Sequence, residues 1–294
     1  MPADKNHPAD KNHPTAMKSS GSRRTIGVIA SDVYDDIPRA MWRGITDAAR
    51  ERDVNVVYFS AGLQLNIITW QADLLYRLVD PARVDGLIVI PSTLAINQSP
   101  SNAADLAQRF AGLPMISLDG VFEGAPCVLK DNYRGMYDVL THLIVVHDKR
   151  RIVLVPGPVG FEGVEERYQA WKDALAEHGL PFDPNLVTPA LKSWRYEDAI
   201  ELFQTFLETH GLRPRNDFDA VAAANDEAAM AAIHVLQKRG LRVPDDVAVT
   251  GFDDLDLAGV NVPPLTTARP PFYALGCQAV ELLHRGAEGH VGLL

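Results

Sequence analysis

The segment FDAVAAANDEAAMAAIHVLQKRGLRVPDDVAVTGFDD, residues 218–254, decides the fold. It opens with a short apolar run at residues 219–224 and breaks at Asn225-Asp226. A helical pattern rich in Ala, Met, Ile, Val and Leu follows and ends at a glycine, and residues 245–254 then give a second strand. A strand, a helix and a strand in this order form one βαβ crossover, which implies a parallel sheet with helices packed on its faces.

Both strands of this crossover end in small polar residues, Asn225-Asp226 and Asp253-Asp254. Because ligands of open α/β sheets bind in the crevice beyond the carboxyl strand ends, we expect these side chains to face one cleft. The alternative is that they only cap helices and form turns, for which Asn and Asp are well suited. The same pattern recurs elsewhere in the chain, and this favours ligand binding.

Strand and helix patterns alternate along the rest of the chain, then restart near residue 130, which predicts an α/β fold of two doubly wound parallel-sheet subdomains joined by hinge crossovers. We expect the N-terminal subdomain at residues 24–130 plus 271–294 and the C-terminal subdomain at 131–270. Residues 1–23, which nearly repeat PADKNHP, are polar and aperiodic and are expected to form a disordered tail. A hinge between two lobes makes a cleft that can close on a ligand.

The alternation rests on runs of apolar residues. We expect strands at residues 25–30, 54–59, 84–91, 113–120 and 151–157, and an extended segment at 263–271. We expect helices from about residue 38, at 74–79, 105–110, 139–146, 165–178 and 196–210, and at 275–283.

Composition excludes several classes of protein. The 294 residues carry a formal net charge of −10, which disfavours binding to the negatively charged phosphate backbone of a nucleic acid. Two cysteines are too few for a disulfide scaffold or a zinc site, and the histidines lack partners at metal spacing, so we expect no metal and no cofactor. The chain lacks a long apolar run and the apolar core of a secretion signal, which predicts a cytoplasmic protein without a membrane partner.

Many short segments together resemble one known family, the LacI/GalR transcription regulators. From about residue 24 to 283 the chain is similar to their effector-binding core, whose fold is that of the type I periplasmic binding proteins. The resemblance is carried by Ile26-Gly27-Val28-Ile29, Val84-Asp85-Gly86-Leu87-Ile88, Asp131-Asn132-Tyr133-Arg134-Gly135, Glu166-Arg167, Ala224-Asn225-Asp226, residues 239–249, Gly251-Phe252-Asp253-Asp254 and Pro263-Pro264-Leu265-Thr266-Thr267.

Two departures from the family pattern concern the ends of the chain. The DNA-reading helix-turn-helix precedes the core in this family, and the first 24 residues offer no such helix. The core also ends with a further strand, and the chain stops at residues 289–294, about where that strand would begin. We therefore expect a segment of a longer protein, with DNA contacted only through a part that this chain lacks.

The resemblance implies that the ligand lies between the lobes and contacts strand-end residues of both. The residues expected to bind it are Asp32, Tyr34 and Asp119 from the first lobe, and Asp131, Phe161, Arg167, Trp194, Asn225 and Asp253 from the second. Carboxylates accept hydrogen bonds from hydroxyls, a guanidinium holds two oxygens, and aromatic rings cover apolar ring faces. These groups suit a sugar or another small polyhydroxylated molecule.

Each residue also has a structural alternative: Asp32 as a helix cap, Trp194 and Phe161 as core residues, Arg167 as a solvated charge. The leading functional interpretation is a non-catalytic sensor of a LacI-type regulator, or of a larger protein with a kinase or cyclase domain. A stand-alone transport binding protein is an alternative that the missing secretion signal disfavours. An enzyme is a third, but no nucleophile–base pair or metal cluster supports it. The resemblance also implies a homodimer.

Overall fold

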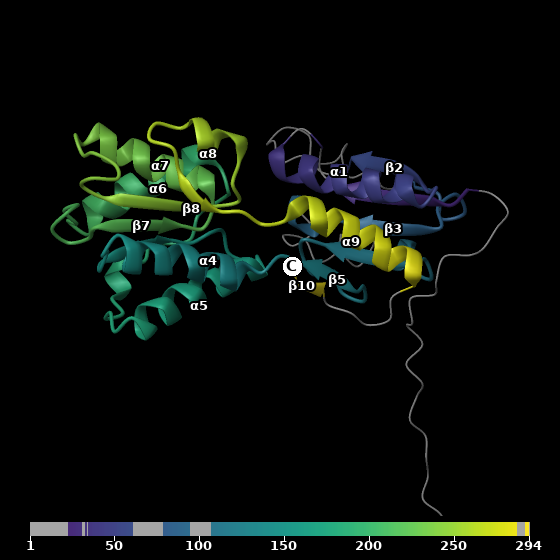
Figure 1. Cartoon of the computed structure of the whole chain (residues 1–294), viewed down its shortest axis with the longest axis horizontal. Helices are drawn as coiled ribbons and strands as arrows, with labels where there is room; N and C mark the ends of the chain where they lie inside the picture. The colour runs from purple at the N-terminus through teal and green to yellow at the C-terminus, as the bar shows by residue number, and fades with distance from the viewer. Residues whose placement is uncertain are drawn as a thin grey trace, which may run out of the picture. The chain divides into compact units, whose positions relative to one another are not determined.

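The computed structural model describes residues 23–30, 33, 35–60, 79–94, 107–286 and 292–293. These residues form two compact units (Figure 1). Unit 1 contains the described residues up to Leu129 and those from Phe272 to Leu293, and unit 2 is Lys130–Pro271. None of the helices in these ranges has the length and apolar character needed to traverse a bilayer.

Unit 1 is built on a parallel sheet. Its strands, in the order in which they pair, are β10 (Gly292–Leu293), β5 (Cys127–Leu129), β4 (Met115–Leu118), β3 (Gly86–Val89), β1 (Thr25–Ala30) and β2 (Asn55–Ser60). Helices α1 (Asp36–Glu51) and α9 (Phe272–Arg285) pack together, and a short 3-10 helix, Pro91–Thr93, follows β3. The close packing of the two helices depends on Gly44 and Gly276, where a Cβ atom would overlap backbone atoms of the neighbouring helix.

Unit 2 is built on a second parallel sheet. Its strands pair in the order β6 (Ile152–Val155), β7 (Ala220–Ala223), β8 (Ala248–Phe252) and β9 (Thr266–Ala268). The helices are α4 (Asn132–Thr141), continued by a π-helix at His142–Val146, α5 (Glu162–Glu177), α6 (Tyr196–Thr209), α7 (Asp226–Lys238) and α8 (Asp256–Val260), with a 3-10 turn at Pro184–Leu186. Helices α6 and α7 lie on one face of the sheet, and α4 and α5 lie on the other (Figure 1).

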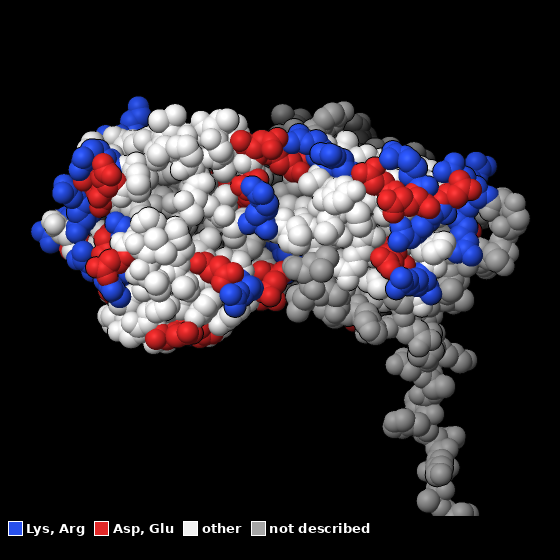
Figure 2. All heavy atoms as spheres, in the orientation of Figure 1, with Lys and Arg blue, Asp and Glu red and all other residues white. Residues whose placement is uncertain are grey.

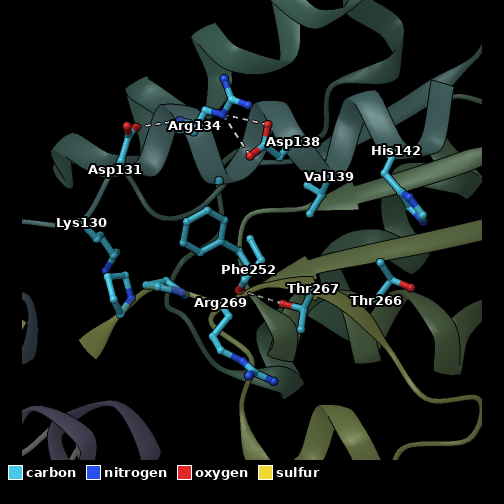
Figure 3. A pocket seen from close by; sticks show the side chains of 14 residues that line it. Lys130, Asp131, Arg134, Asp138, Val139, His142, Phe252, Thr266, Thr267 and Arg269 are labelled. Atoms are coloured by element: carbon cyan, nitrogen blue, oxygen red, sulfur yellow. Dashed lines mark hydrogen bonds and ion pairs between the residues drawn. The ribbon is translucent and has the colours of Figure 1, made fainter. Parts of the chain in front are cut away.

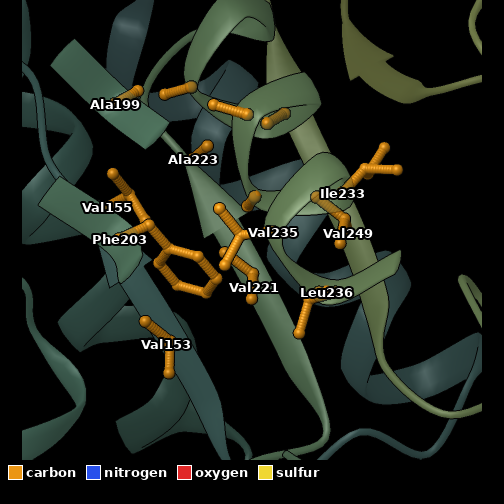
Figure 4. Close-up of a cluster of buried hydrophobic side chains, with 14 of the residues drawn as sticks. Val153, Val155, Ala199, Phe203, Val221, Ala223, Ile233, Val235, Leu236 and Val249 are labelled. Carbon is orange, nitrogen blue, oxygen red and sulfur yellow. The ribbon is translucent and has the colours of Figure 1, made fainter. Parts of the chain in front are cut away.

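The unit 2 strands read as continuous apolar runs because both faces of the sheet are buried. Along β6, Val153 and Val155 face α6 and α7, whereas Ile152 and Leu154 face α4 and α5. Figure 4 shows the first of these two clusters, in which Phe203 of α6 lies among valines of the sheet. Helices packed on both faces of the sheet therefore hold its strands, and the residues at their carboxyl ends, in place.

The predicted parallel α/β architecture is confirmed. The predicted start of one helix is wrong, because α4 begins at Asn132 rather than at Val139. The side chain of Asp131 accepts a hydrogen bond from the backbone N–H of Arg134 at 2.7 Å and thereby caps the helix earlier. The expected tail up to residue 22, and residues 74–78 and 105–106 of two predicted helices, lie outside the described ranges.

Charged side chains on the face shown in Figure 2 mix both signs over the two units. Several arginines of unit 2 are paired with carboxylates, as in Arg213 with Asp217 at 3.1 Å and Arg242 with Asp246 at 2.9 Å. These pairs hold the pKa of Asp217 below its usual range and lower that of Asp246 to about 2, mainly through the arginine hydrogen bonds. The paired arginines are thus locally neutralised.

Candidate functional site

Three of the predicted residues come from the expected N-terminal subdomain. Asp32 and Tyr34 lie outside the described residues. Asp119 follows β4 with a buried side chain and a left-handed backbone, φ 57°. Ser92, which follows β3, donates its hydroxyl to Asp119 Oδ2 at 2.8 Å. The carboxyl ends of two adjacent strands therefore place a carboxylate and a hydroxyl together, and Ser92 was missed because nothing in its sequence context marks it.

In unit 2, two predicted aromatic residues lie together beyond the carboxyl end of β6. The rings of Phe161 and Trp194 form an edge-to-face pair with centroids 5.6 Å apart. The Trp194 ring covers Gly157, and a Cβ atom at position 157 would overlap it. Glycine at position 157 therefore allows the indole to approach the loop closely, and both rings remain partly exposed.

Arg167 points inward from α5 and is 5% exposed, so it is not a solvated charge. Its Nε and Nη2 donate to Asn132 Oδ1 at 3.2 and 2.8 Å, and its Nη1 donates to the carbonyl of Ala224. The guanidinium carbon lies 3.8 Å from the centroid of the Phe252 ring and 5.8 Å from that of Trp194. These contacts fix the plane of the guanidinium beside the ends of β7 and β8.

Asn132 and Phe252 therefore belong to the cluster around Arg167, and sequence reasoning missed both. Asn132 is itself buried, and a Cβ atom on Gly163 of α5 would lie 2.8 Å from its amide. The signal was present, since Asn132 belongs to a segment that carries the family resemblance, but its partner lies 35 residues away. Pattern analysis does not connect residues so distant.

Asn225, at the end of β7, acts as the helix cap that the alternative interpretation described. Its Oδ1 accepts the backbone N–H of Ala228 at 2.9 Å. Its Nδ2 donates to the backbone carbonyl of Trp194 at 3.2 Å, so the same amide holds the segment that carries the indole. A side-chain amide has two N–H donors and an oxygen with two lone pairs. Beyond these two hydrogen bonds, Asn225 therefore has one N–H and one lone pair left for a ligand.

Asp253 follows β8, the strand next to β7, with φ 114°. Its backbone N–H donates to the carbonyl of Ala268 at 2.9 Å. Behind it lies Asp226, whose side chain is fully buried. Burial raises the pKa of Asp226 to about 7; hydrogen bonds from Thr267 and Leu255 oppose the rise, and the charges of Asp253 and Asp254 add to it. A carboxyl group that titrates near neutrality thus lies beside the predicted ligand contact.

Asp131 is exposed and lines a pocket of about 430 Å³ (Figure 3), and its side chain caps α4. The pocket is lined by α4 on one side and by β9 with the segment after it on the other. Phe252 forms part of its wall, as does Thr267, so the pocket and the Arg167 cluster share one aromatic ring. Among the described residues, no group of three or more His, Cys, Asp or Glu could hold a metal ion.

The structure therefore brings together four of the predicted residues of unit 2, Phe161, Arg167, Trp194 and Asn225, and Asp253 follows the adjacent strand β8 at the same carboxyl edge of the sheet. They supply an aromatic pair, a fixed guanidinium, an amide and a carboxylate. This set can hold a small molecule with several hydroxyl groups, because it offers both donors and acceptors beside an apolar face.

Comparisons with known proteins agree with this fold. A model of the periplasmic binding protein-like domain matches residues 141–291, more than half of the chain. The ribose operon repressor of Bacillus subtilis (strain 168) is 27% identical over 266 residues, which cover 88% of this chain and 73% of that protein. The transcriptional repressor PurR of Haemophilus influenzae (strain PittEE) is 31% identical over 202 residues, 68% of this chain and 56% of that protein.

Solved structures show the same similarity. The transcriptional regulator CelR in complex with cellobiose has a TM-score of 0.75 and 26% identity, covering 94% of this chain and 83% of that one. The lac repressor dimer bound to operator and the anti-inducer ONPF has a TM-score of 0.73 at 22% identity, covering 93% and 91%, and shows the fold. The chain belongs to the LacI/GalR family of transcription regulators, and it corresponds to their effector-binding core, which has a periplasmic binding protein-like fold.

Proposed function

We propose that this chain is the sensor of a LacI-type transcription regulator and that it binds a small, sugar-like effector without transforming it. The observation that carries the proposal is the cluster at the carboxyl edge of the unit 2 sheet. There Trp194 and Phe161 offer ring faces, Arg167 a fixed guanidinium and Asp253 a carboxylate. The relatives named above are transcription regulators, which favours a regulator over a transport protein.

The chemistry of the cluster supports a polyhydroxylated ligand. Sugar hydroxyls donate to carboxylates and accept from guanidinium and amide N–H groups, while the apolar face of a pyranose ring packs on an aromatic ring. Two named relatives point the same way, since one is a ribose operon repressor and another was solved with cellobiose. Asp119 with Ser92, and the predicted Asp32 and Tyr34, are further proposed contacts. Ligand-driven closure of the two lobes and the homodimer stay predictions.

A thermal-shift screen tests the proposal. The probes are D-ribose, cellobiose, adenosine and L-arginine, each from 0.1 to 10 mM. A ligand that binds only the folded protein, at a concentration of about one hundred times its Kd, stabilises it by about 2.7 kcal/mol. This raises the melting temperature measurably. We expect a saturable shift with at least one sugar.

Variants then locate the site. Trp194→Ala and Asp253→Asn should remove the shift, whereas Tyr133→Ala, which removes an exposed ring of α4 whose hydroxyl donates to Asp173 of α5, should retain it. If both Trp194→Ala and Asp253→Asn retained the full rise in melting temperature with the sugar, the binding site would lie elsewhere. A saturable shift with adenosine or L-arginine and none with either sugar would retain the sensor but contradict the sugar-like effector.

A further inference from the structure

Asp226 is one of the strand-end residues expected to face the cleft, but it is buried instead, and its carboxylate joins three segments of unit 2. It lies in the first turn of α7 and is 0% exposed. Its Oδ2 accepts the backbone N–H of Leu255 at 2.8 Å, and its Oδ1 accepts the hydroxyl of Thr267 at 2.5 Å. It packs on Gly251 of β8, where a Cβ atom would overlap Oδ1. One side chain thus ties α7 to the turn after β8 and to β9.

The turn after β8 has a backbone that needs such support. Asp253 has φ 114° and Asp254 has φ 54°, a region that L residues rarely occupy and that persists only where the surroundings impose it. The backbone N–H of Asp254 points at Thr267 Oγ1 at 3.4 Å, and Arg269 forms an ion pair with the Asp254 carboxylate. Thr267 is therefore shared between the turn and Asp226.

We propose that Asp226 is a positioning residue for effector binding, which holds the turn that carries Asp253 through the Leu255 N–H and the Thr267 hydroxyl. The proposal rests on the proposed function in one respect, that Asp253 contacts the effector. Asp226 itself is buried behind the turn and acts through it. A substitution that removes both hydrogen bonds, such as Asp226→Ala, should therefore weaken binding by releasing Asp253 from its fixed backbone conformation.

The charge of Asp226 gives this role a measurable signature. The charged groups that face it are Asp253 and Asp254 on the turn, with Arg269 paired to Asp254. Its pKa of about 7 places its titration near neutral pH. When protonated, the carboxyl group can still accept from Leu255 and can donate to Thr267 Oγ1, whose own hydrogen then turns toward the carbonyl of Ala268, 3.3 Å away. Protonation of Asp226 thus keeps its hydrogen bonds with Leu255 and Thr267 and removes the repulsion between its charge and those of Asp253 and Asp254.

Two substitutions separate these effects. Asp226→Asn copies the protonated arrangement, because the amide oxygen can accept from Leu255 and the amide N–H can donate to Thr267. Asp226→Ala removes both bonds and leaves the Leu255 N–H without this acceptor. Glu227→Gln is the matched control, since it removes a negative charge from the same helical turn but contacts the backbone N–H of Tyr196 instead.

The experiment is residue-resolved amide hydrogen exchange of the whole chain without ligand, at pH 5.5 and pH 8, corrected for intrinsic exchange rates. In the wild type, protection of the Leu255 amide should be at least threefold greater at pH 5.5 than at pH 8. Asp226→Asn should abolish this pH dependence and retain the protection found at pH 5.5. Asp226→Ala should lower protection at least tenfold at both pH values, and Glu227→Gln should behave as the wild type.

A folded Asp226→Ala protein whose Leu255 exchange stays within twofold of the wild type would overturn the proposal. If Asp226→Ala does not fold, the test rests on Asp226→Asn. Protection of the Leu255 amide that depends on pH in Asp226→Asn as it does in the wild type would overturn the proposal as well. The exchange measurement needs no effector, so its outcome is independent of the thermal-shift screen. If a sugar is found and Asp226→Ala retains its full shift, the positioning role is refuted while the proposed function stands.

Discussion

Between pH 5 and pH 8 the wild-type protein should lose stability that an Asp226→Asn variant retains. The pKa of Asp226 is about 7 in the folded protein, mainly because burial penalises its charged form. In the unfolded chain the pKa of an Asp is about 3.9. Because the folded pKa is raised, the protonated group favours folding, and this contribution is complete below pH 4 and is lost as the pH rises through 7.

The magnitude follows from the two pKa values. Their difference of about 3 units, at about 1.4 kcal/mol per unit, corresponds to about 4 kcal/mol between low pH and pH 8. About 1–2 kcal/mol of this is already lost at pH 5, because the unfolded chain ionises first, and about 2–3 kcal/mol remains to be lost between pH 5 and pH 8. Asp246, whose pKa is lowered to about 2, contributes stability above pH 4 that is lost only as the pH falls further, so it does not interfere.

The assay is urea unfolding followed by tryptophan fluorescence at half-unit steps from pH 5 to pH 8. The quantity of interest is the difference in free energy of unfolding between the wild type and Asp226→Asn, because other titrating groups cancel in it. The difference should change by about 2–3 kcal/mol over this range, with the variant gaining stability relative to the wild type as the pH rises. A difference that stays constant within about 0.5 kcal/mol would refute the reasoning, because it would mean that the folded pKa is not raised.

Three further predictions concern the site and the assembly. Gly157→Ala should displace the Trp194 ring, cost about 1–3 kcal/mol of stability as overpacking does, and weaken effector binding, as urea unfolding and the thermal-shift assay would show. Asn225→Asp should keep the helix cap, worth about 1 kcal/mol, but lose the amide donor to the Trp194 carbonyl, so that effector binding weakens while stability falls less than in Asn225→Ala. Light scattering of the purified chain should give twice the monomer mass of 32.2 kDa, and a monomer at micromolar concentration would contradict the expected homodimer.

The parallel architecture was predictable because its cause is local. A strand buried on both faces, such as β6 or β7, is a continuous apolar run, and this is visible in any short window of sequence. Helix ends were predictable where a glycine adopts a left-handed backbone, as Gly179 and Gly211 do with φ of 67° and 61°. The short strand β5 was missed because three residues are too few to show a period.

The candidate site was predictable only in part, because its contacts join distant residues. The family resemblance implied that Arg167 and Asn225 contact the ligand, and in the structure Arg167 of α5 and Asn225 both lie near the carboxyl end of β7. The partners that fix them come from elsewhere: Asn132 is 35 residues from Arg167, and the Thr267 hydroxyl is 41 residues from Asp226. One acceptor, the carbonyl of Ala224, is a backbone atom that residue type does not reveal.

The two interpretations of Asn225 that the sequence left open are compatible in the structure. Its oxygen caps α7, and its nitrogen holds the backbone of the segment that presents Trp194. Asp226, the next residue, holds the turn that presents Asp253. Two consecutive residues at the end of one strand therefore fix an aromatic ring on one side and a carboxylate on the other. Because an effector would be contacted by what these residues hold, substitutions at Asn225 and Asp226 should alter binding even where neither side chain touches the ligand.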